Sequence, residues 1–173
     1  NTLTFTIDPD DAKDFDDALS FKKLKNNNVE IGIHIADVTH YLEKNTLLDK
    51  EAKKRATSVY LSDRVVPMLP EILSNDLCSL NPNEDKNVFS VLVEIDNNYN
   101  IISKEFSKCL INSNERMSYQ EAQHVIENKT EKLPADVTIT KKKRSLSKEL
   151  VEAILHLNSV ALKLKEKRKK EGS

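Results

Sequence analysis

Glycine and tryptophan are scarce in this sequence. Only two glycines, Gly32 and Gly172, occur in 173 residues, and there is no tryptophan. A Walker loop or a dinucleotide-binding fingerprint needs several clustered glycines, because backbone N–H groups must approach phosphate closely. Both motifs are therefore excluded, together with glycine-rich linkers. If the chain acts on phosphate, it must use a metal ion or its Lys and Arg side chains.

Cysteine and long apolar runs are scarce as well. Cys78 and Cys109 match no zinc-binding spacing, and we expect both to be reduced in the core of a cytoplasmic protein. No apolar run approaches the roughly 18 residues of a membrane span, so we expect no membrane partner. The sequence begins with Asn1 instead of Met and shows no signal peptide. We therefore expect a portion of a longer protein.

The charges nearly cancel overall but are segregated along the chain. There are 27 Lys and Arg residues against 28 Asp and Glu, in a chain with 38% hydrophobic residues. Residues 8–17 carry a charge of −5, whereas residues 141–144 carry +4 and residues 163–170 carry +5. The basic runs suit solvated surface or a helix C-terminus, or alternatively a weak path for RNA phosphates. The length and composition predict a single folded domain over residues 1–173.

The order of hydrophobic patterns predicts an α+β (mixed α/β) fold. We expect an antiparallel or mixed sheet built from two hairpins and packed against helices. Residues 65–70 contain two prolines, so they should form a rigid extended link and not a central strand. The predicted strands are residues 4–7, 18–24, 29–36, 87–96 and 100–111; the predicted helices are residues 46–58, 118–128 and 147–170; residues 129–143 are expected to be irregular.

For two of these helices, the sequence also predicts where the helix begins or which face is buried. Ser118 and Glu121 have the spacing of a capping box at the start of the second predicted helix. The third predicted helix has apolar residues at alternating steps of four and three, which indicates one buried stripe. The members of this stripe are Leu150, Ile154, Leu157, Ala161 and Leu164.

An acidic segment directly follows the first predicted strand. It contains six aspartates, one lysine and one phenylalanine: Asp8, Asp10, Asp11, Lys13, Asp14, Phe15, Asp16 and Asp17. Neighbouring like charges repel, so such a segment is either solvated or neutralised by a cation. Phe15 should be buried, and its burial would draw Asp14 and Asp16 into a partly desolvated cleft. A solvated loop and a metal site are both compatible with this pattern.

The ligand types narrow the choice of metal. Carboxylate oxygens suit Mg²⁺, Mn²⁺ or Ca²⁺, but the spacing is not that of an EF-hand, which would need glycine at the position of Lys13. A phosphatase or glycosyltransferase site formed by Asp14 and Asp16 is one alternative interpretation, and a non-catalytic RNA-binding module is another. Four carboxylates without histidine also suit paired magnesium ions that act on a phosphodiester.

Several short blocks follow one another in order along residues 6–82. The first block is TIDPDDAKDFDDA at residues 6–18, and the second is HIADVTHY at residues 34–41. The others are ATSVYL at residues 56–61, VPMLP at residues 66–70 and LSNDLCSLNP at residues 73–82. Together these blocks resemble the ribonuclease II and ribonuclease R family, whose catalytic part is the RNB domain. The residues TSVY at positions 57–60 are more similar to ribonuclease R than to ribonuclease II.

This resemblance implies a processive 3′→5′ exoribonuclease that hydrolyses single-stranded RNA to nucleoside 5′-monophosphates. By position, the family's four metal-site aspartates are Asp8, Asp14, Asp16 and Asp17. The resemblance implies a two-ion mechanism with Mg²⁺, or Mn²⁺ in its place, and no organic cofactor. Asp10 and Asp11 stand at positions that the family does not use as ligands.

Two tyrosines match positions at which the family contacts RNA. Tyr60 resembles the tyrosine that stacks on the 3′-terminal base, and Tyr119 resembles a second tyrosine of the nucleotide channel. Stacking does not depend on base identity, which suits an enzyme that degrades any sequence. The family's later half, with an arginine and a glutamate that bind phosphate, has no match here, nor do the flanking cold-shock and S1 modules. We therefore expect little or no activity from this chain alone.

The histidines fit a structural role better than catalysis. No serine or cysteine stands near His34 or His40 in a pattern of nucleophilic catalysis, and their spacing is no metal motif. We expect both, with Asp37, to make structural hydrogen bonds. His124 and His156 lie on predicted helices and should be ordinary surface or edge residues.

Overall fold

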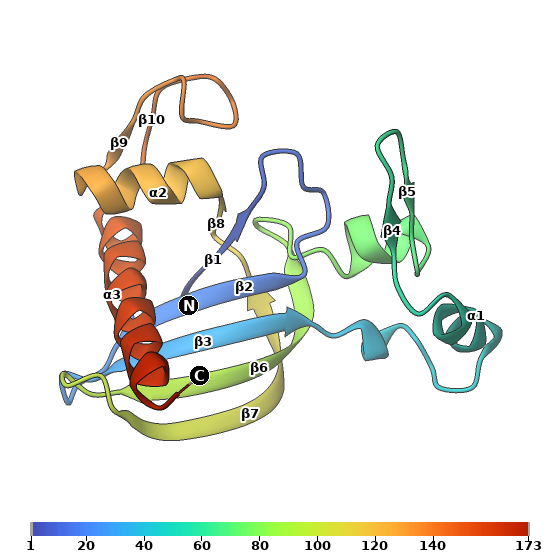
Figure 1. Cartoon of the computed structure of the whole chain (residues 1–173), viewed down its shortest axis with the longest axis horizontal. Helices are drawn as coiled ribbons and strands as arrows, with labels where there is room; N and C mark the ends of the chain where they lie inside the picture. Colours follow the sequence, from blue (N-terminus) through green and yellow to red (C-terminus); the bar gives the residue numbers. More distant parts are fainter. Residues whose placement is uncertain (1, 173) are drawn as a thin grey trace.

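A six-stranded sheet forms the centre of the computed structural model, which describes residues 2–172 (Figure 1). The order of its strands is β7-β6-β3-β2-β1-β8, and only β1 and β8 pair in parallel among the neighbours in this sheet. The predicted hairpins are β2–β3 and β6–β7, so the α+β prediction is confirmed. The bounds are β1 (Leu3–Asp8), β2 (Asp17–Lys23), β3 (Val29–Ala36), β6 (Asp85–Ile95), β7 (Ile101–Asn112) and β8 (Glu115–Ser118).

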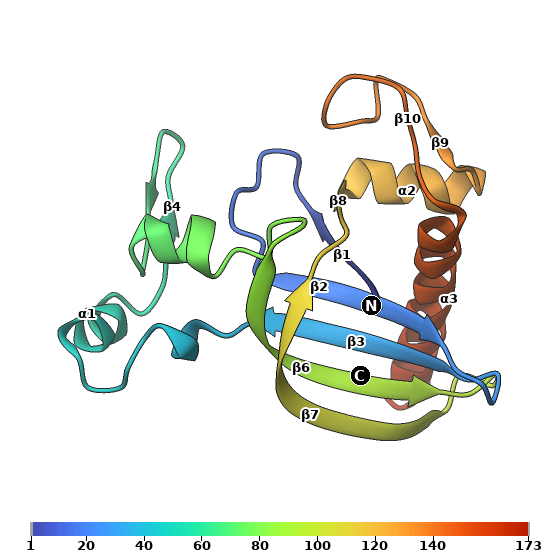
Figure 2. The same cartoon turned by 180° about the vertical axis from the view of Figure 1, so that it is seen from behind.

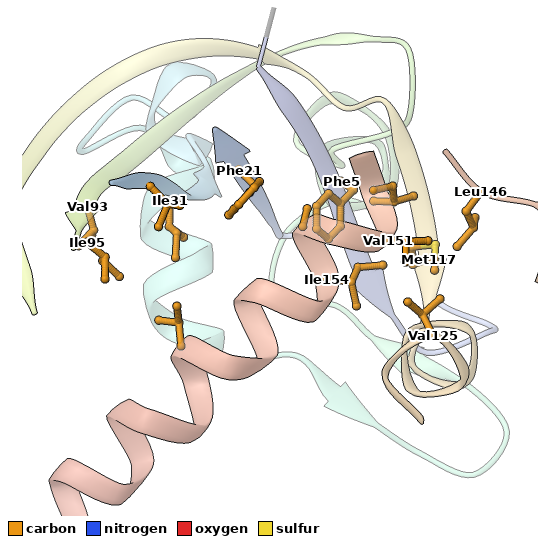
Figure 3. Close-up of a cluster of buried hydrophobic side chains, with 14 of the residues drawn as sticks. Phe5, Phe21, Ile31, Val93, Ile95, Met117, Val125, Leu146, Val151 and Ile154 are labelled. Atoms are coloured by element: carbon orange, nitrogen blue, oxygen red, sulfur yellow. The ribbon is translucent and has the colours of Figure 1, made fainter. Parts of the chain in front are cut away.

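Two helices close the main core against this sheet. α3 (Lys148–Lys170) lies along one sheet face, and α2 (Tyr119–Asn128) packs between α3 and β1 (Figures 1 and 3). The predicted capping box is present: Glu121 N donates to Ser118 Oγ over 3.1 Å, and Ser118 N donates to Glu121 Oε2 over 2.9 Å. The sheet contributes Phe5, Phe21, Ile31, Val93 and Ile95 to this core, and the helices contribute Val125, Leu150, Val151, Ala153, Ile154 and Val160.

The predicted stripe on α3 is correct except at one position. Leu150 and Ile154 are buried, and Leu157 and Leu164 are half-buried against the core. Ala161 is exposed, and the neighbouring Val160 is buried in its place. The helix therefore turns Val160 toward the sheet, and the larger side chain fills the space that the repeat assigned to Ala161. Within residues 2–172, no helix combines the length and apolar character needed to span a bilayer.

Between β3 and β6 the chain forms an arm that extends to one side of the sheet, on the right in Figure 1 and on the left in Figure 2. The predicted helix at residues 46–58 ends early, because Ala56 adopts a left-handed conformation with φ of 63°. The link at residues 65–70 stays out of the central sheet, as predicted, but it contributes β5. The arm contains η1 (Val38–His40), α1 (Leu47–Arg55), β4 (Val59–Tyr60), β5 (Val65–Val66) and η2 (Leu73–Leu77), and β4 pairs with β5.

A second, smaller core lies where the arm and the acidic segment meet the sheet. Its buried members are Phe15, Ala18, Ala36, Leu73, Cys78, Leu80 and Val88. Cys78 is buried and Cys109 is half-buried, and neither forms a disulfide, as predicted. This core joins the acidic loop to the base of the arm, so the two form one side of the molecule.

One short ribbon was not predicted. Residues 129–143, expected to be irregular, contain β9 (Lys132–Leu133), which pairs with β10 (Arg144–Ser145). Leu133 is fully buried in the main core. A two-residue strand has too little hydrophobic alternation to be recognised in the sequence, and its pairing depends on this burial.

Candidate active site

The acidic loop joins two neighbouring antiparallel strands at one edge of the sheet. Asp8 is the last residue of β1 and Asp17 is the first residue of β2, so both stand at the same edge. Asp14 and Asp16 lie between them in the loop, where the charge of Asp14 raises the pKa of both Asp8 and Asp16, as described below. The four aspartates that the sequence singled out therefore lie along one loop, at the end of β1 and the start of β2.

Phe15 anchors the loop as its apolar side chain predicted, with 5% of its surface exposed. Its backbone N–H donates to Ser79 Oγ over 3.0 Å, and its carbonyl accepts from Leu80 N over 2.9 Å. The next carbonyl, of Asp16, accepts from Ala36 N over 2.9 Å. Phe15 and Asp16 are thus fixed through their backbone groups, and Asp14 and Asp16 are the sequence neighbours of a buried ring.

Burial and crowding oppose the charged state of two of these carboxylates. Desolvation is the largest cause of the raised pKa of Asp8, and the negative charges of Asp17 and Asp14 raise it further, whereas the nearby Thr6 side chain and the charge of Arg116 lower it in part. Asp16 is exposed, unlike Asp8, but partial desolvation of its carboxyl group, and then the charges of Asp14, Asp17 and Asp8, raises its pKa. The folded chain therefore holds a concentration of negative charge that a cation would relieve.

The donors suit a hard divalent cation, since all of them are carboxylate oxygens. Asp8 Oδ2 is buried without a hydrogen-bond partner among the described residues, so it is available as a ligand. Within residues 2–172, no three acidic, histidine or cysteine side chains already converge as tightly as a metal site requires. The residue types and their crowding fit a metal, and the carboxylates must move closer together to hold one.

Tyr60 reaches the aspartates from the arm. It lies in β4 with 69% of its surface exposed, and its hydroxyl donates a long hydrogen bond to Asp14 Oδ2 over 3.4 Å. The negative charge of Asp14 raises the pKa of Tyr60. A cleft of ≈ 730 Å³ separates the arm from the acidic loop, and its lining includes Asp8, Asp14, Tyr60 and Arg64. No local sequence pattern pointed to Arg64, which lines the cleft because the arm folds back toward the acidic loop.

Tyr119 stands near the same edge but outside this cleft. It is the first residue of α2 and is 59% exposed. Ser118 precedes it and pairs with Asp8 across β8 and β1, which places Tyr119 next to the end of β1. Asp16 and Asp17 are also absent from the residues that line the cleft. The predicted residues thus share one edge of the sheet without sharing one cavity.

His34 and Asp37 make structural contacts, in line with the prediction. The ring of His34 is buried, and its two nitrogens lie 2.7 Å from Ser90 Oγ and 2.9 Å from Ser20 Oγ. Burial lowers the pKa of His34, which favours the neutral ring. Asp37 is buried and forms an ion pair with Lys108, whose Nζ lies 2.8 Å from Asp37 Oδ2. This contact holds the pKa of Asp37 below its usual range.

His40 differs from the prediction. Its side chain is exposed and lies edge-on to the ring of Tyr41, with 4.9 Å between the ring centroids. His156 is half-buried at the edge of the main core, 5.3 Å from the ring of Phe21. Neither histidine touches the acidic loop, so histidine has no place in the candidate site.

Comparisons with known proteins define the class of this chain. Residues 1–173 match the RNB domain, and the chain belongs to that family. Ribonuclease R 1 of Lactococcus lactis is 52% identical over 126 residues, which cover 73% of this chain and 15% of that protein. DIS3-like exonuclease 2 of Xenopus tropicalis is 39% identical over 173 residues, which cover 100% of this chain and 21% of that protein.

Solved structures agree with this assignment. RNase R of Mycoplasma genitalium, in complex with ribose-methylated single-stranded RNA, superposes with a TM-score of 0.85 at 30% identity, covering 100% of this chain and 25% of that one. Yeast Ssd1, described as a pseudonuclease, shares the fold at 24% identity with a TM-score of 0.67 over 73% of this chain and 15% of that one. The fold therefore occurs with and without nuclease activity, and the side chains must carry the functional argument.

Proposed function

We propose that this chain is the metal-binding portion of a 3′→5′ exoribonuclease catalytic domain that acts on single-stranded RNA. The observation that carries this proposal is the gathering of four aspartates at one sheet edge, with Tyr60 bonded to one of them. The chain spans 15–21% of the two curated relatives described above, so the activity of a whole enzyme is part of the proposal.

In this proposal Asp8, Asp14, Asp16 and Asp17 hold Mg²⁺, or Mn²⁺ in its place. When bound, two such ions supply Lewis acidity, which activates a water and neutralises charge on the phosphodiester. Asp8 and Asp17 are held by the ends of β1 and β2, whereas Asp14 and Asp16 are held by the buried ring between them. In this proposal two of the metal ligands therefore come from strand ends and two from the loop that joins them.

Tyr60 and Tyr119 bind RNA in this proposal by stacking on bases. Both side chains are more than half exposed, so their ring faces are accessible to a base. Base–aromatic stacking contributes about 1–3 kcal/mol for each base and is indifferent to sequence. The bond from Tyr60 to Asp14 places this stacking surface directly beside a candidate metal ligand.

The alternative of a two-aspartate phosphatase or glycosyltransferase needs only Asp14 and Asp16. It would be favoured if Asp8 lay far from Asp16, yet the charge of Asp8 contributes to the raised pKa of Asp16. The four-carboxylate interpretation accounts for this proximity and for the unpartnered Asp8 Oδ2. The remaining alternative, an RNA-binding module without catalysis, is decided by the experiment below.

The test is hydrolysis of 5′-labelled single-stranded RNA with Mg²⁺, using this chain and a longer natural protein that contains it. We expect the longer protein to release nucleoside 5′-monophosphates and Asp16→Asn to abolish the release, whereas this chain alone binds RNA with little or no hydrolysis. Full activity of the Asp16→Asn protein would contradict the site. Binding without hydrolysis by the longer protein would support the non-catalytic module, and processive hydrolysis by the chain alone would contradict its incompleteness.

A further inference from the structure

Arg116 reaches from β8 to the acidic loop and binds its backbone. One guanidinium nitrogen, Nη2, donates to the carbonyl of Asp10 over 2.9 Å, to that of Pro9 over 3.2 Å and to that of Ala12 over 3.3 Å. The centre of the guanidinium lies 4.8 Å from the centroid of the Phe15 ring. A single side chain thus contacts both the turn that begins the loop and the ring that anchors its end.

The strand pairing directs Arg116 toward Asp8 as well. β8 runs parallel to β1 with Arg116 opposite Thr6, and side chains alternate along a strand, so Asp8 shares the face of Thr6. Arg116 Nε, Thr6 Oγ1 and Asp8 Oδ2 are all buried without hydrogen-bond partners among residues 2–172. This sheet face therefore presents a cation and two polar oxygens beneath the loop.

The loop needs such support because its charges drive it apart. Residues 8–17 carry −5, and within its first turn Ala12 N donates to Pro9 O over 3.2 Å. The carbonyls of this turn otherwise point at Arg116. A planar guanidinium can donate to several carbonyls while it stacks on an aromatic ring, and its fixed fork of donors suits this arrangement better than the compact charge of a lysine ammonium.

We propose that Arg116 is a positioning residue for the aspartates: it fixes the backbone of residues 9–12 and the Phe15 ring, and thereby sets the directions of Asp14 and Asp16 relative to Asp8. The inference rests on the proposed metal site for its consequence, since correctly directed carboxylates bind the ion more tightly. Its structural part, an ordered loop, holds with or without metal.

The test is hydrogen exchange by mass spectrometry on the metal-free chain, with Arg116→Lys beside the original sequence. We expect the amides in residues 9–16, other than Pro9, which has no N–H, to exchange about tenfold faster in Arg116→Lys, because the planar group that bonds three loop carbonyls and contacts the Phe15 ring is lost. Exchange in β6 and α3 should stay unchanged. If Arg116→Lys is globally unfolded, Arg116→Gln, which keeps a planar donor, is measured in its place.

Arg144→Lys is the matched control. Arg144 is ion-paired with Glu115 over 3.2 Å and with Glu121 over 3.6 Å, beside the same strand, but it does not contact the loop. We expect Arg144→Lys to leave exchange in residues 9–16 at the original rate. Unchanged loop exchange in the Arg116 variant, or faster exchange of equal size throughout the chain, would overturn the positioning role.

Mn²⁺ titration of the same proteins tests the functional consequence. We expect the dissociation constant of Mn²⁺ to rise about tenfold in the Arg116 variant and to stay unchanged in Arg144→Lys. Equal affinity in the Arg116 variant and the original chain would overturn the inference that the aspartates depend on Arg116. If the original chain binds no Mn²⁺, the proposed metal site fails, and the exchange experiment still decides whether Arg116 orders the loop.

Discussion

Asp8 and Asp16 are held in surroundings that disfavour their ionised form. Desolvation is the largest cause for both, and nearby carboxylates add to it. The pKa of each carboxyl in the folded chain lies above the ordinary value of 3.8. In the pH range between 3.8 and the raised pKa, the folded chain therefore binds more protons than the unfolded chain. The metal-free protein therefore loses stability as the pH rises through that interval.

The substitution Asp16→Asn tests this predicted direction of the change in stability with pH. In the presence of EDTA we expect it to raise the free energy of unfolding at pH 7 by on the order of 1 kcal/mol, the size of one relieved like-charge repulsion. At pH 3 the carboxyl is protonated in both states, so the gain should disappear. Urea unfolding at both pH values measures the effect, with Asp11→Asn, exposed on the same loop, as the control. A gain of equal size at pH 3 would show that charge is not the cause.

Tyr60 should contribute to RNA binding through its ring and not through its hydroxyl. We expect Tyr60→Ala to weaken binding of a single-stranded oligonucleotide about tenfold or more, whereas Tyr60→Phe keeps most of the affinity. Fluorescence anisotropy with a labelled oligonucleotide measures both. Tyr41→Ala is the control, because Tyr41 is also exposed on the arm but its ring meets that of His40 edge-on. Equal losses in Tyr60→Phe and Tyr60→Ala would rule out stacking as the main contribution.

Single residues divide clearly into those that the sequence identified and those that it missed. The aspartates and Tyr60 stand in a distinctive local pattern, and the burial of Phe15 follows from its apolar ring. In the sequence, Arg116 lies 104, 106 and 107 residues from the three residues whose carbonyls it binds. Such a contact depends on the parallel pairing of β8 with β1, and no local pattern encodes that pairing.

Among the elements, β2, β3 and β6 are fitted together around one glycine. A Cβ at Gly32 would overlap the Ser20 hydroxyl and the His34 ring. These groups are buried and hydrogen-bonded to each other, and His34 is bonded to Ser90 as well, so they have little freedom to move. Of the two glycines in the chain, this one is required by close approach inside the sheet.

We expect Gly32→Ala to lower the free energy of unfolding by about 1–3 kcal/mol through overpacking. Denaturant unfolding followed by circular dichroism measures the change. Ser20→Ala in the same chain removes one of the two overlapping groups, so the double variant should recover part of the loss. If Gly32→Ala is as stable as the original chain, the close packing of these three strands is wrong.

Elements whose signals are local were predicted well. The capping box at Ser118, the two antiparallel hairpins and the long C-terminal helix each depend on residues close in sequence. The structure departs from prediction at two helix positions: α1 ends early at Ala56, which adopts a left-handed conformation, and Val160 is buried in place of Ala161. The second departure depends on neighbours in space, because Val160 packs into the main core. The β9–β10 ribbon likewise exists because Leu133 packs into a core built from the rest of the chain.

The whole molecule places an arm and a sheet edge around one acidic loop. Tyr60 and Asp14 are 46 residues apart in the sequence and meet only because the arm folds back over the loop. Composition alone favoured a solvated loop as readily as a metal site. The ordered blocks that resemble the RNB domain predicted the family, which the match over residues 1–173 confirms, whereas the cleft and its lining required the structure.

Calorimetric titration of the chain with Mn²⁺ tests the proposed metal site most directly. We predict that the original chain binds Mn²⁺, that Asp8→Asn, Asp14→Asn and Asp16→Asn each abolish the binding or weaken it strongly, and that Asp11→Asn has little effect. EDTA should reverse the binding fully. If the original chain binds no Mn²⁺, or if Asp11→Asn weakens binding as much as Asp16→Asn does, the four aspartates do not form the proposed site.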